Sequence, residues 1–282
     1  MMKNRGIIPI NKPKDWTSFD VVNKLKYKLK PLKVGHLGTL DPMATGVLLI
    51  TVGKATKLFD LMQDKKKTYL ATFEFGYLTD TLDATGHIVE KNDKIPSTDE
   101  ILNVLPKFIG KISQIPPKYS AKSINGVRAY DLARQGAEFE LKAKTVEVFD
   151  IKLLSYENKT LTLEIECGSG TYIRSIGRDI AKELNSLATM TSLVRTQIGS
   201  FNIENCKDIQ NIENLQDVIL PIKEFLPYIK LNVTKEQQFK LLNGQTINIE
   251  LVDGVYMLED EVDALALIKI KENKAKMSLF LG

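Results

Sequence analysis

Residues 35–52 read GHLGTLDPMATGVLLITV, a loop marked by three glycines that runs directly into an apolar segment. Asp41 stands before a proline in the middle of this loop. The segment 47–52 is rich in Val, Leu and Ile and follows turn residues, which predicts a buried strand. Loops between regular elements often position functional groups. The stretch therefore predicts a loop that presents Asp41 beside a buried strand.

Helical patterns lie on both sides of this loop. A Thr17-Ser18 cap and apolar residues at helical spacing predict a short helix with a basic outer face over residues 18–30. A second helix is expected after Ser97 or Thr98, and a third after residue 172. The apolar faces expected for these three helices consist of Phe19, Val22, Leu25 and Leu29; of Ile101, Leu102, Leu105 and Phe108; and of Ile173, Ile176, Ile180, Ala181 and Leu184.

Strand patterns alternate with these helices. Residues 69–75 alternate apolar Tyr, Ala, Phe and Phe with the residues between them, a period of two that is typical of a strand. Residues 146–154 and 160–166 predict two strands joined by a turn. After Pro227 the chain predicts a helix near 234–242 and short strands to the end. Strands and helices therefore share the main domain, and a small β-rich part follows it.

The composition restricts the class of protein. With 282 residues, of which 43% are hydrophobic and 26% charged, the chain is typical of a soluble globular protein rather than a disordered, collagen-like or disulfide-stabilised one. Cys167 and Cys206 are far apart, and with His36 and His87 they form no pair at metal-ligand spacing. We therefore expect free thiols, no metal, and chemistry based on carboxylates, arginines, tyrosines and hydroxyls.

Charge is distributed unevenly along the chain. Residues 3–33 hold nine basic against two acidic residues, and residues 114–144 hold six against three. We interpret residues 114–144 as an inserted basic arm. Both segments would attract a polyanion such as a nucleic acid, although a solvated lysine-rich face explains the charge alone equally well. The chain has no signal-peptide core and no apolar run of membrane-spanning length, which predicts a cytoplasmic protein without a membrane partner.

Each polar or aromatic residue that could carry chemistry has an ordinary structural explanation when it is taken singly. Asp41 could cap a helical turn that begins at the following proline. Arg174 could form a surface salt bridge of little consequence. The others could be turn, core or capping residues: His36, Tyr69, Tyr172, Asp80 and Asp83.

In combination, the motifs resemble one family. Residues 35–48 resemble the catalytic motif of the TruB-type tRNA pseudouridine-55 synthases, and further blocks resemble that family in the same order, from about residue 5 to residue 226. These blocks are Asn11-Lys12-Pro13, Lys67-Thr68-Tyr69, Asp80 to Gly86, Ile115 to Ala121, Gly126 to Tyr130, Gly170 to Arg174 and Leu193 to Thr196.

The resemblance implies a fold and an activity. The fold is α+β, with a mixed, largely antiparallel central sheet and flanking helices. A catalytic domain is expected over residues 1–228, with the RNA-binding arm near 114–144 inserted in it, and a small β-rich domain similar to the PUA domain over residues 229–282. The activity is isomerisation of the uridine at position 55, in the TΨC loop of tRNA, to pseudouridine. No metal, nucleotide or other cofactor is implied, and we expect a monomer that binds the TΨC stem-loop.

The resemblance also implies roles for single residues. Asp41 matches the nucleophile, Arg174 the arginine that forms an ion pair with it, and Tyr69 the tyrosine stacked on the target base. The residues expected to contact the RNA or to line the uracil pocket are His36, Tyr172, Leu193, Lys12 and Asp83, with Lys12 in a block that is either structural or RNA-facing. The lysines and arginines expected to hold phosphates are Lys118, Lys122, Arg128 and Arg134.

Elementary chemistry agrees with these roles. A stacked uridine must leave its loop before the glycosidic bond is reachable, and aromatic and apolar walls recover the cost of unstacking. A buried carboxylate needs a positive neighbour to stay ionised, and an arginine offers a permanent charge and a planar fork. Three other functions stay open at this point. A non-catalytic RNA-binding protein would not need Asp41 beside Arg174, a glycoside hydrolase would need two carboxylates at the sugar bond, and a uracil-releasing glycosylase would leave an abasic site.

Overall fold

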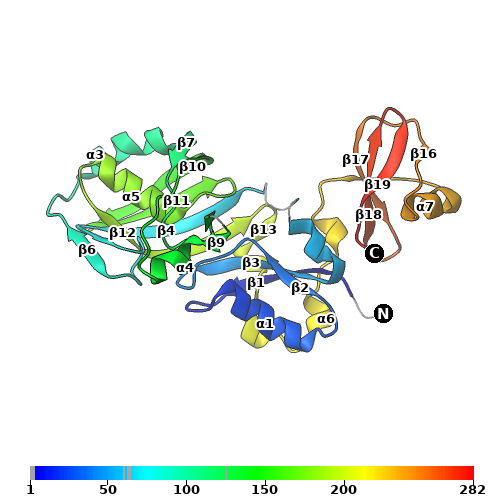
Figure 1. Cartoon of the computed structure of the whole chain (residues 1–282), viewed down its shortest axis with the longest axis horizontal. Helices are drawn as coiled ribbons and strands as arrows, with labels where there is room; N and C mark the ends of the chain where they lie inside the picture. Colours follow the sequence, from blue (N-terminus) through cyan, green and yellow to red (C-terminus); the bar gives the residue numbers. More distant parts are fainter. Residues whose placement is uncertain (1–3, 60, 62–64, 125) are drawn as a thin grey trace.

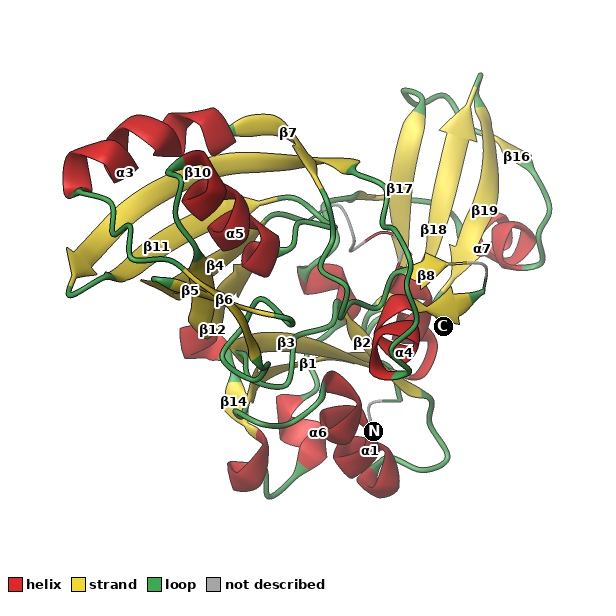
Figure 2. Ribbon diagram, turned by 60° about the vertical axis from the view of Figure 1, so that its left-hand side comes forward, coloured by secondary structure: helices red, strands yellow, loops and turns green. Residues whose placement is uncertain are grey.

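A 10-stranded mixed sheet forms the centre of the molecule (Figures 1 and 2). The computed structural model describes residues 4–59, 61, 65–124 and 126–282, so Lys3 of the basic N-terminal segment and Asn125 of the predicted arm lie outside the described residues. The strands of this sheet are β1 (Gly6–Lys12), β2 (Val34–Leu37), β3 (Thr45–Val52), β4 (Lys67–Phe75), β7 (Gly110–Gln114), β10 (Lys144–Glu157), β11 (Thr160–Cys167), β12 (Ala188–Ile198), β13 (Phe201–Asn202) and β14 (Lys207–Asp208).

The order of the strands is β14-β1-β3-β12-β4-β11-β10-β7, with β2 paired to β3 and β13 paired to β12. Two pairings, β1 with β14 and β3 with β12, are parallel, and the other pairings of this sheet are antiparallel. The predicted α+β class with a mixed, largely antiparallel sheet is therefore confirmed. The loop expected over residues 35–46 is shorter, because its first three residues belong to β2 and its last two to β3.

Burial of the strands follows the pattern of the sequence. In β4 every second residue from Lys67 to Phe75 is buried, as the alternation predicts. In β3, Leu48 and Ile50 belong to one apolar cluster, and Val47 and Leu49 belong to another on the opposite face. Burial on both faces explains why this segment is apolar without interruption.

Helices cover the first of these clusters. The bounds are α1 (Ser18–Lys28), α3 (Thr98–Val104), α4 (Ala129–Arg134), α5 (Ile173–Glu183), α6 (Leu215–Val218) and α7 (Lys235–Leu242), with 3-10 turns η1 (Gly53–Leu58), η2 (Leu105–Phe108), η3 (Ile203–Asn205), η4 (Ile209–Asn211) and η5 (Ile222–Glu224). Thr17 and Asp20 form a capping box at the start of α1. The predicted inner face of α5 is buried in full. In the described residues, no helix is long and apolar enough to cross a membrane.

Two predicted core residues are wrong. Phe19 is 61% exposed, and Val21 is buried in its place. The buried face of α1 is centred on Val21, Val22 and Leu25, and Phe19 lies beside that face rather than on it. Leu102 of α3 is 48% exposed for the same reason, since Ile101 and Val104 form the inner face.

Helix α5 lies unusually close to strand β4. A Cβ atom at Gly177 would lie 2.2 Å from the ring of Phe73. Glycine at this position therefore permits the helix that carries Arg174 to approach the strand that carries Tyr69.

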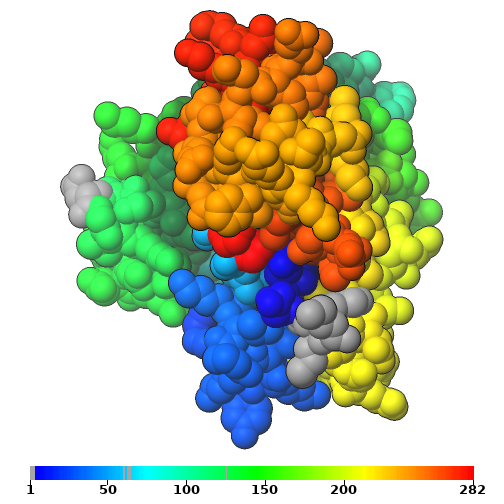
Figure 3. Space-filling view, turned by 90° about the vertical axis from the view of Figure 1, so that its right-hand side faces the viewer, coloured from blue at the N-terminus to red at the C-terminus, as the bar shows by residue number. Residues whose placement is uncertain are grey.

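The segment between β7 and β10 leaves the sheet and returns to it at the same level, because Gln114 and Lys144 are paired neighbours at its two ends. It contains the small hairpin of β8 (Ser123–Ile124) and β9 (Val127–Arg128) and helix α4. Its four predicted phosphate-binding residues, Lys118, Lys122, Arg128 and Arg134, are exposed. In Figure 3 this green part of the chain projects from the body. Its binding of RNA remains a prediction.

The C-terminal residues form a 5-stranded sheet with the order β15-β17-β18-β19-β16. Its strands are β15 (Ile229–Lys230), β16 (Ile247–Asn248), β17 (Gly254–Glu259), β18 (Ala264–Lys271) and β19 (Lys274–Phe280), and the small hairpin of β5 (Tyr77–Thr79) and β6 (Ile88–Lys91) lies apart from it. Met257, Leu267 and Leu281 join the apolar cluster of Ile7 and Leu49. Arg5 adds an ion pair of 2.6 Å to Asp260. This sheet therefore lies beside the end of the main sheet where β1 begins (Figure 1), and Lys57 of η1 donates to the carbonyl of Phe280 in β19. The boundary at residue 228 remains a prediction.

Substitution Gly177→Ala is expected to lower the free energy of unfolding by about 1–3 kcal/mol, the usual cost of overpacking, because the new methyl group collides with Phe73. Gly254→Ala is the control, since the nearest atom to its Cβ would be 3.7 Å away. Urea denaturation of the two variants measures the difference, and equal midpoints would contradict the close contact of α5 with β4.

Candidate active site

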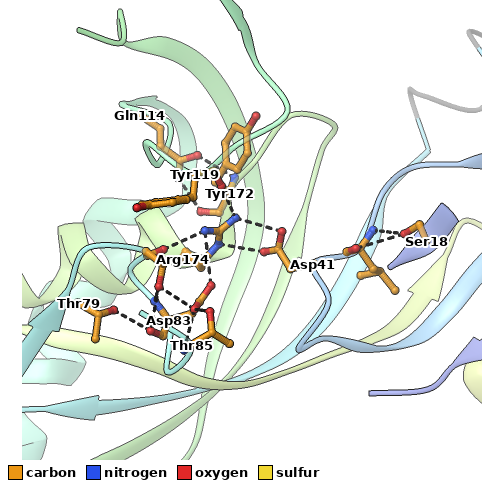
Figure 4. Close-up of polar contacts among 11 residues, drawn as sticks. Ser18, Asp41, Thr79, Asp83, Thr85, Gln114, Tyr119, Tyr172 and Arg174 are labelled. Atoms are coloured by element: carbon orange, nitrogen blue, oxygen red, sulfur yellow. Dashed lines mark hydrogen bonds and ion pairs between the residues drawn. The ribbon is translucent and has the colours of Figure 1, made fainter. Parts of the chain in front are cut away.

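Arg174 lies at the centre of a polar cluster between the two halves of the sheet (Figure 4). Its Nε atom is 2.9 Å from Oδ2 of Asp41, and its second terminal nitrogen donates to Oδ1 of Asp41 at 3.1 Å. The arginine is 6% exposed, whereas the Asp41 side chain keeps 33% of its surface. This two-point ion pair is the geometry that an arginine forms best with a carboxylate. It leaves Asp41 open on one side and held on the other.

The remaining donors of Arg174 are bound to the backbone. The carbonyl of Thr81 accepts at 2.9 Å and the carbonyl of Tyr119 accepts at 3.0 Å. Asp83 adds a second carboxylate at 3.5 Å. Contacts from three separate segments therefore fix the plane of the guanidinium before any substrate binds.

Asp83 lies behind this arginine. It is 5% exposed, and its Oδ1 atom accepts hydrogen bonds from the hydroxyls of Thr81 and Thr85 and from the backbone N–H of Thr85. The neighbouring backbone pairs with Met190 of β12. The structure thus brings Asp83 to Arg174 as an orienting group. Direct contact of Asp83 with substrate remains a prediction.

The loop that carries Asp41 is held through its backbone. Ser18, at the start of α1, accepts from the N–H of Leu40 at 2.9 Å and donates to the carbonyl of Leu40 at 3.2 Å. The N–H of Ala44 donates to the carbonyl of Asp41, and the N–H of Asp15 donates to the carbonyl of Pro42. The position of Asp41 is therefore set by hydrogen bonds from several segments of the chain.

Lys12 is one of the groups that hold this loop. It is fully buried, and its ammonium donates to the carbonyls of Pro13 at 2.9 Å, Trp16 at 2.5 Å and Pro42 at 3.1 Å. Burial lowers the pKa of Lys12 to about 8. Of the two roles expected for its block, the structure supports the structural one, because the ammonium faces the loop and not the solvent.

Burial also acts on Asp41. It raises the pKa of the Asp41 carboxyl above its usual value of 3.8, and the charge of Asp83 acts in the same direction. Arg174, by charge and hydrogen bond, and Lys12, by charge, oppose the rise in pKa. Arg174 therefore favours the ionised form of Asp41 against the effect of burial.

Tyr69 and Leu193, which are expected to stack on and enclose the target base, are both buried; that role remains a prediction. They lie on the neighbouring strands β4 and β12, are 7% and 6% exposed, and belong to the same apolar cluster. Burial raises the pKa of the Tyr69 hydroxyl, which therefore stays protonated at neutral pH. In the resting site this protonated hydroxyl is therefore not a base.

Tyr172 stands at the start of α5, two residues before Arg174. The side chain of Gln114 binds its backbone at both ends, accepting from the N–H at 2.8 Å and donating to the carbonyl at 3.2 Å. Both residues line a small pocket together with Lys122 and Lys144 of the arm. The base of the arm is therefore joined to the segment that carries the arginine.

His36 lies on β2 and is half-buried. Burial, and next the charge of Arg195, lower the pKa of His36, so that its imidazole is neutral at neutral pH. Its Nδ1 atom is buried without a hydrogen-bond partner among the described residues. No hydrogen bond or ion pair joins His36 to Asp41 or Arg174 in the described parts of the chain. Its expected contact with RNA remains a prediction.

Five residues that orient the site were not predicted: Ser18, Thr81, Gln114, Tyr119 and Arg195. Each acts mainly through backbone carbonyls or amides, a contact that leaves no pattern in the sequence. Thr81, Tyr119 and Arg195 lie within the quoted blocks, which was the available signal. No group of three or more potential metal ligands occurs among the residues that the structure describes.

Residues 24–173 match a family model that is described as TruB family pseudouridylate synthase (N terminal domain). A tRNA pseudouridine synthase B of Clostridium kluyveri is 40% identical over 272 residues, which cover 95% of this chain and 93% of the relative. One of Mycoplasma mobile is 39% identical over 279 residues, 98% of this chain and 94% of the relative.

The chain belongs to the TruB family of pseudouridylate synthases. This membership confirms the predicted family and enzyme class. The fold has a further likeness to the structure of a Cbf5-Nop10-Gar1 complex, with a TM-score of 0.72, 23% identity, and coverage of 99% of the synthase and 84% of that chain. At this identity the likeness concerns the fold alone.

Substitution Lys12→Met in the synthase is expected to lower the free energy of unfolding by about 1.5–3 kcal/mol, because three carbonyls lose a charged donor. Affinity for RNA should stay within about threefold, or about 0.7 kcal/mol, since the buried ammonium cannot reach a phosphate. Exposed Lys14→Met is the control for stability. Weaker RNA binding at unchanged stability would instead make Lys12 an RNA contact.

Proposed function

We propose that this synthase converts the uridine at position 55, in the TΨC loop of tRNA, to pseudouridine. The observation that carries the proposal is the two-point ion pair of Asp41 with Arg174 in a chain whose relatives are tRNA pseudouridine synthases B. The position of the target uridine rests on the resemblance of residues 35–48 and the other motifs. A protein that only binds or folds RNA has no use for a carboxylate held in this way.

In the proposed mechanism Asp41 is the nucleophile. The reaction breaks the bond between N1 of uracil and C1′ of the ribose and forms a bond between C5 and C1′. The C5 proton is lost and N1 gains one, so the product is an isomer and no cofactor is required. Arg174 keeps the carboxylate ionised and aims its free side at the reacting nucleotide. Asp83, Thr81 and Tyr119 hold the arginine in that orientation.

The target uridine has to leave the stacked loop to reach Asp41. We propose that it stacks on the ring of Tyr69 and is enclosed by Leu193 and Tyr172, which recover the cost of unstacking. His36 and the exposed cations of the arm would contact the RNA outside the pocket. The chain would act as a monomer on a single stem-loop, and a tRNA substrate makes the cytoplasm the proposed place of action.

The first test uses an unmodified tRNA transcript, with pseudouridine mapped by carbodiimide-blocked primer extension. Wild-type enzyme is expected to modify one uridine of the TΨC arm, and to do so after exhaustive dialysis against EDTA. Asp41→Asn should abolish turnover while affinity for tRNA stays within about tenfold, because phosphate contacts supply most of the affinity. Asp99→Asn, an exposed carboxylate on α3, is the control. Substantial turnover by Asp41→Asn would contradict the nucleophile.

The second test concerns the ion pair. Arg174→Lys should lower the single-turnover rate constant by about 100-fold or more, since lysine lacks the planar fork. The wild-type rate should fall as the pH drops through the Asp41 pKa, because the protonated acid is not a nucleophile. Without the arginine that lowers this pKa, Arg174→Ala should be slower still and lose activity at a higher pH than wild type.

Arg178→Lys, one turn further along α5, is the matched control for both Arg174 variants. Filter binding of tRNA to each variant tests whether a slower rate is caused only by weaker RNA binding. Rates of Arg174→Lys close to those of wild type would overturn the role of the ion pair.

A further inference from the structure

Arg195 is the largest side chain that is fully buried, with 1% of its surface exposed. Its guanidinium donates to three backbone carbonyl oxygens. Nε donates to Val47 at 2.8 Å, and the two terminal nitrogens donate to Gly38 at 3.1 Å and to Thr39 at 3.4 Å. Among the residues described, Arg195 has no acidic partner within ion-pair distance. A buried cation without a carboxylate is costly, and an apolar side chain would fill the same space at less cost.

The carbonyls that Arg195 binds belong to the Asp41 loop. Gly38 and Thr39 precede Asp41 by three and two residues, and Val47 is the third residue of β3, the strand that follows. One guanidinium therefore binds the loop before the carboxylate and the strand after it. Lys12 and Ser18 bind the same loop from the N-terminal side, but neither of them is part of strands β4 and β12.

Arg195 also contacts the second part of the site. On β12 it is the direct register partner of Tyr69 on β4 and lies two residues from Leu193. A hydrogen bond and the charge of Arg195 act on the Tyr69 hydroxyl and oppose the rise in the pKa of Tyr69 that burial causes. The same cation thus touches the loop of the carboxylate and the phenol of the ring.

The backbone of Arg195 is fixed on its other side. It pairs in parallel register with Gly46 of β3, where a Cβ atom would lie 2.2 Å from the Arg195 carbonyl oxygen. Gly46 also has a φ of +101°, a conformation that glycine adopts without strain. The strand cannot move away from the loop without breaking this contact.

We propose that Arg195 is a positioning residue that sets the Asp41 carboxylate against the ring of Tyr69. The proposal rests on the roles given above to Asp41 and Tyr69. A guanidinium can bind the loop, the strand and the phenol at once because its five donors form a rigid fork. A lysine keeps the charge but cannot hold these groups in one plane. Misplacement of a reacting group by about 1 Å can reduce a rate by about 100-fold.

The test compares Arg195→Lys with Arg5→Lys under single-turnover conditions on a tRNA transcript. Arg5 is also largely buried, but it forms an ion pair with Asp260, which follows strand β17 of the C-terminal sheet. In the described residues, Arg5 makes no hydrogen bond or ion pair with the Asp41 loop or with Tyr69. Both variants are expected to lower the melting temperature. Only Arg195→Lys should lower the rate constant, by about 100-fold, with RNA affinity within about threefold. If Arg195 had a purely structural role, Arg195→Lys would reduce the amplitude of the single-turnover reaction, which reports the folded fraction, and leave the rate constant unchanged.

A double-mutant cycle locates the effect. If Arg195 acts in part through the Tyr69 hydroxyl, the double variant Tyr69→Phe/Arg195→Lys should lose less than the product of the two single-variant losses in rate constant. A rate constant for Arg195→Lys within about threefold of wild type would overturn the proposal. So would failure of both Arg195→Lys and Arg195→Gln to fold, because the role would then be one in stability alone.

A readout without substrate separates this proposal from the proposed function. With 13C-labelled tyrosine, the Tyr69 signal is identified by its loss in Tyr69→Phe. It should change in Arg195→Lys and not in Arg5→Lys. Wild-type enzyme that is inactive on tRNA would contradict the proposed function, whereas an unchanged Tyr69 signal would contradict the role of Arg195.

Discussion

The ion pair of Asp41 with Arg174 is the contact on which the rest of the site depends. It joins the loop between β2 and β3 to the start of α5, segments that are 133 residues apart in the chain. Burial of a carboxylate favours its protonated form, and Arg174 favours the ionised form of Asp41 only while it stays within ion-pair distance. The surrounding polar groups hold the two side chains in these positions. Asp83, Thr81 and Tyr119 bind the arginine, and Ser18 and Lys12 bind the loop of the aspartate.

Backbone carbonyls are the main partners of two other buried cations, Lys12 and Arg195. Lys12 binds three of them and Arg195 binds three others, and four of these six carbonyls lie in the loop of Asp41 or at the start of the strand that follows. This arrangement keeps the positive charges from competing with Arg174 for the carboxylate, since neither cation makes an ion pair in the described chain. The charge of Lys12 still favours the ionised form of Asp41, because it opposes the rise in the pKa of Asp41 that burial causes.

Sequence patterns predicted the parts of this structure that depend on the spacing of apolar residues and on capping and turn residues. The alternation of β4, the inner face of α5 and the capped start of α1 follow directly from residue spacing. Phe19 was assigned to the wrong face because a short helix tolerates more than one phase of its apolar stripe, and packing on the sheet decides between them. Family motifs pointed to Asp41 and Arg174. Arg195 and Gln114 were missed because their partners are backbone atoms, and any sequence offers those at every position.

Burial of β3 on both faces completes the constraint on the Asp41 loop. Strand β3 begins four residues after Asp41, so any movement of β3 moves the carboxylate. One face of β3 packs on the cluster that includes α1, and the other face packs on the cluster that includes Met257 and Leu267 of the C-terminal sheet. A strand buried on both faces cannot tilt without opening a cavity, which is costly in a close-packed interior. Packing on both faces of β3 thus fixes the strand that positions the loop holding Asp41 against Arg174.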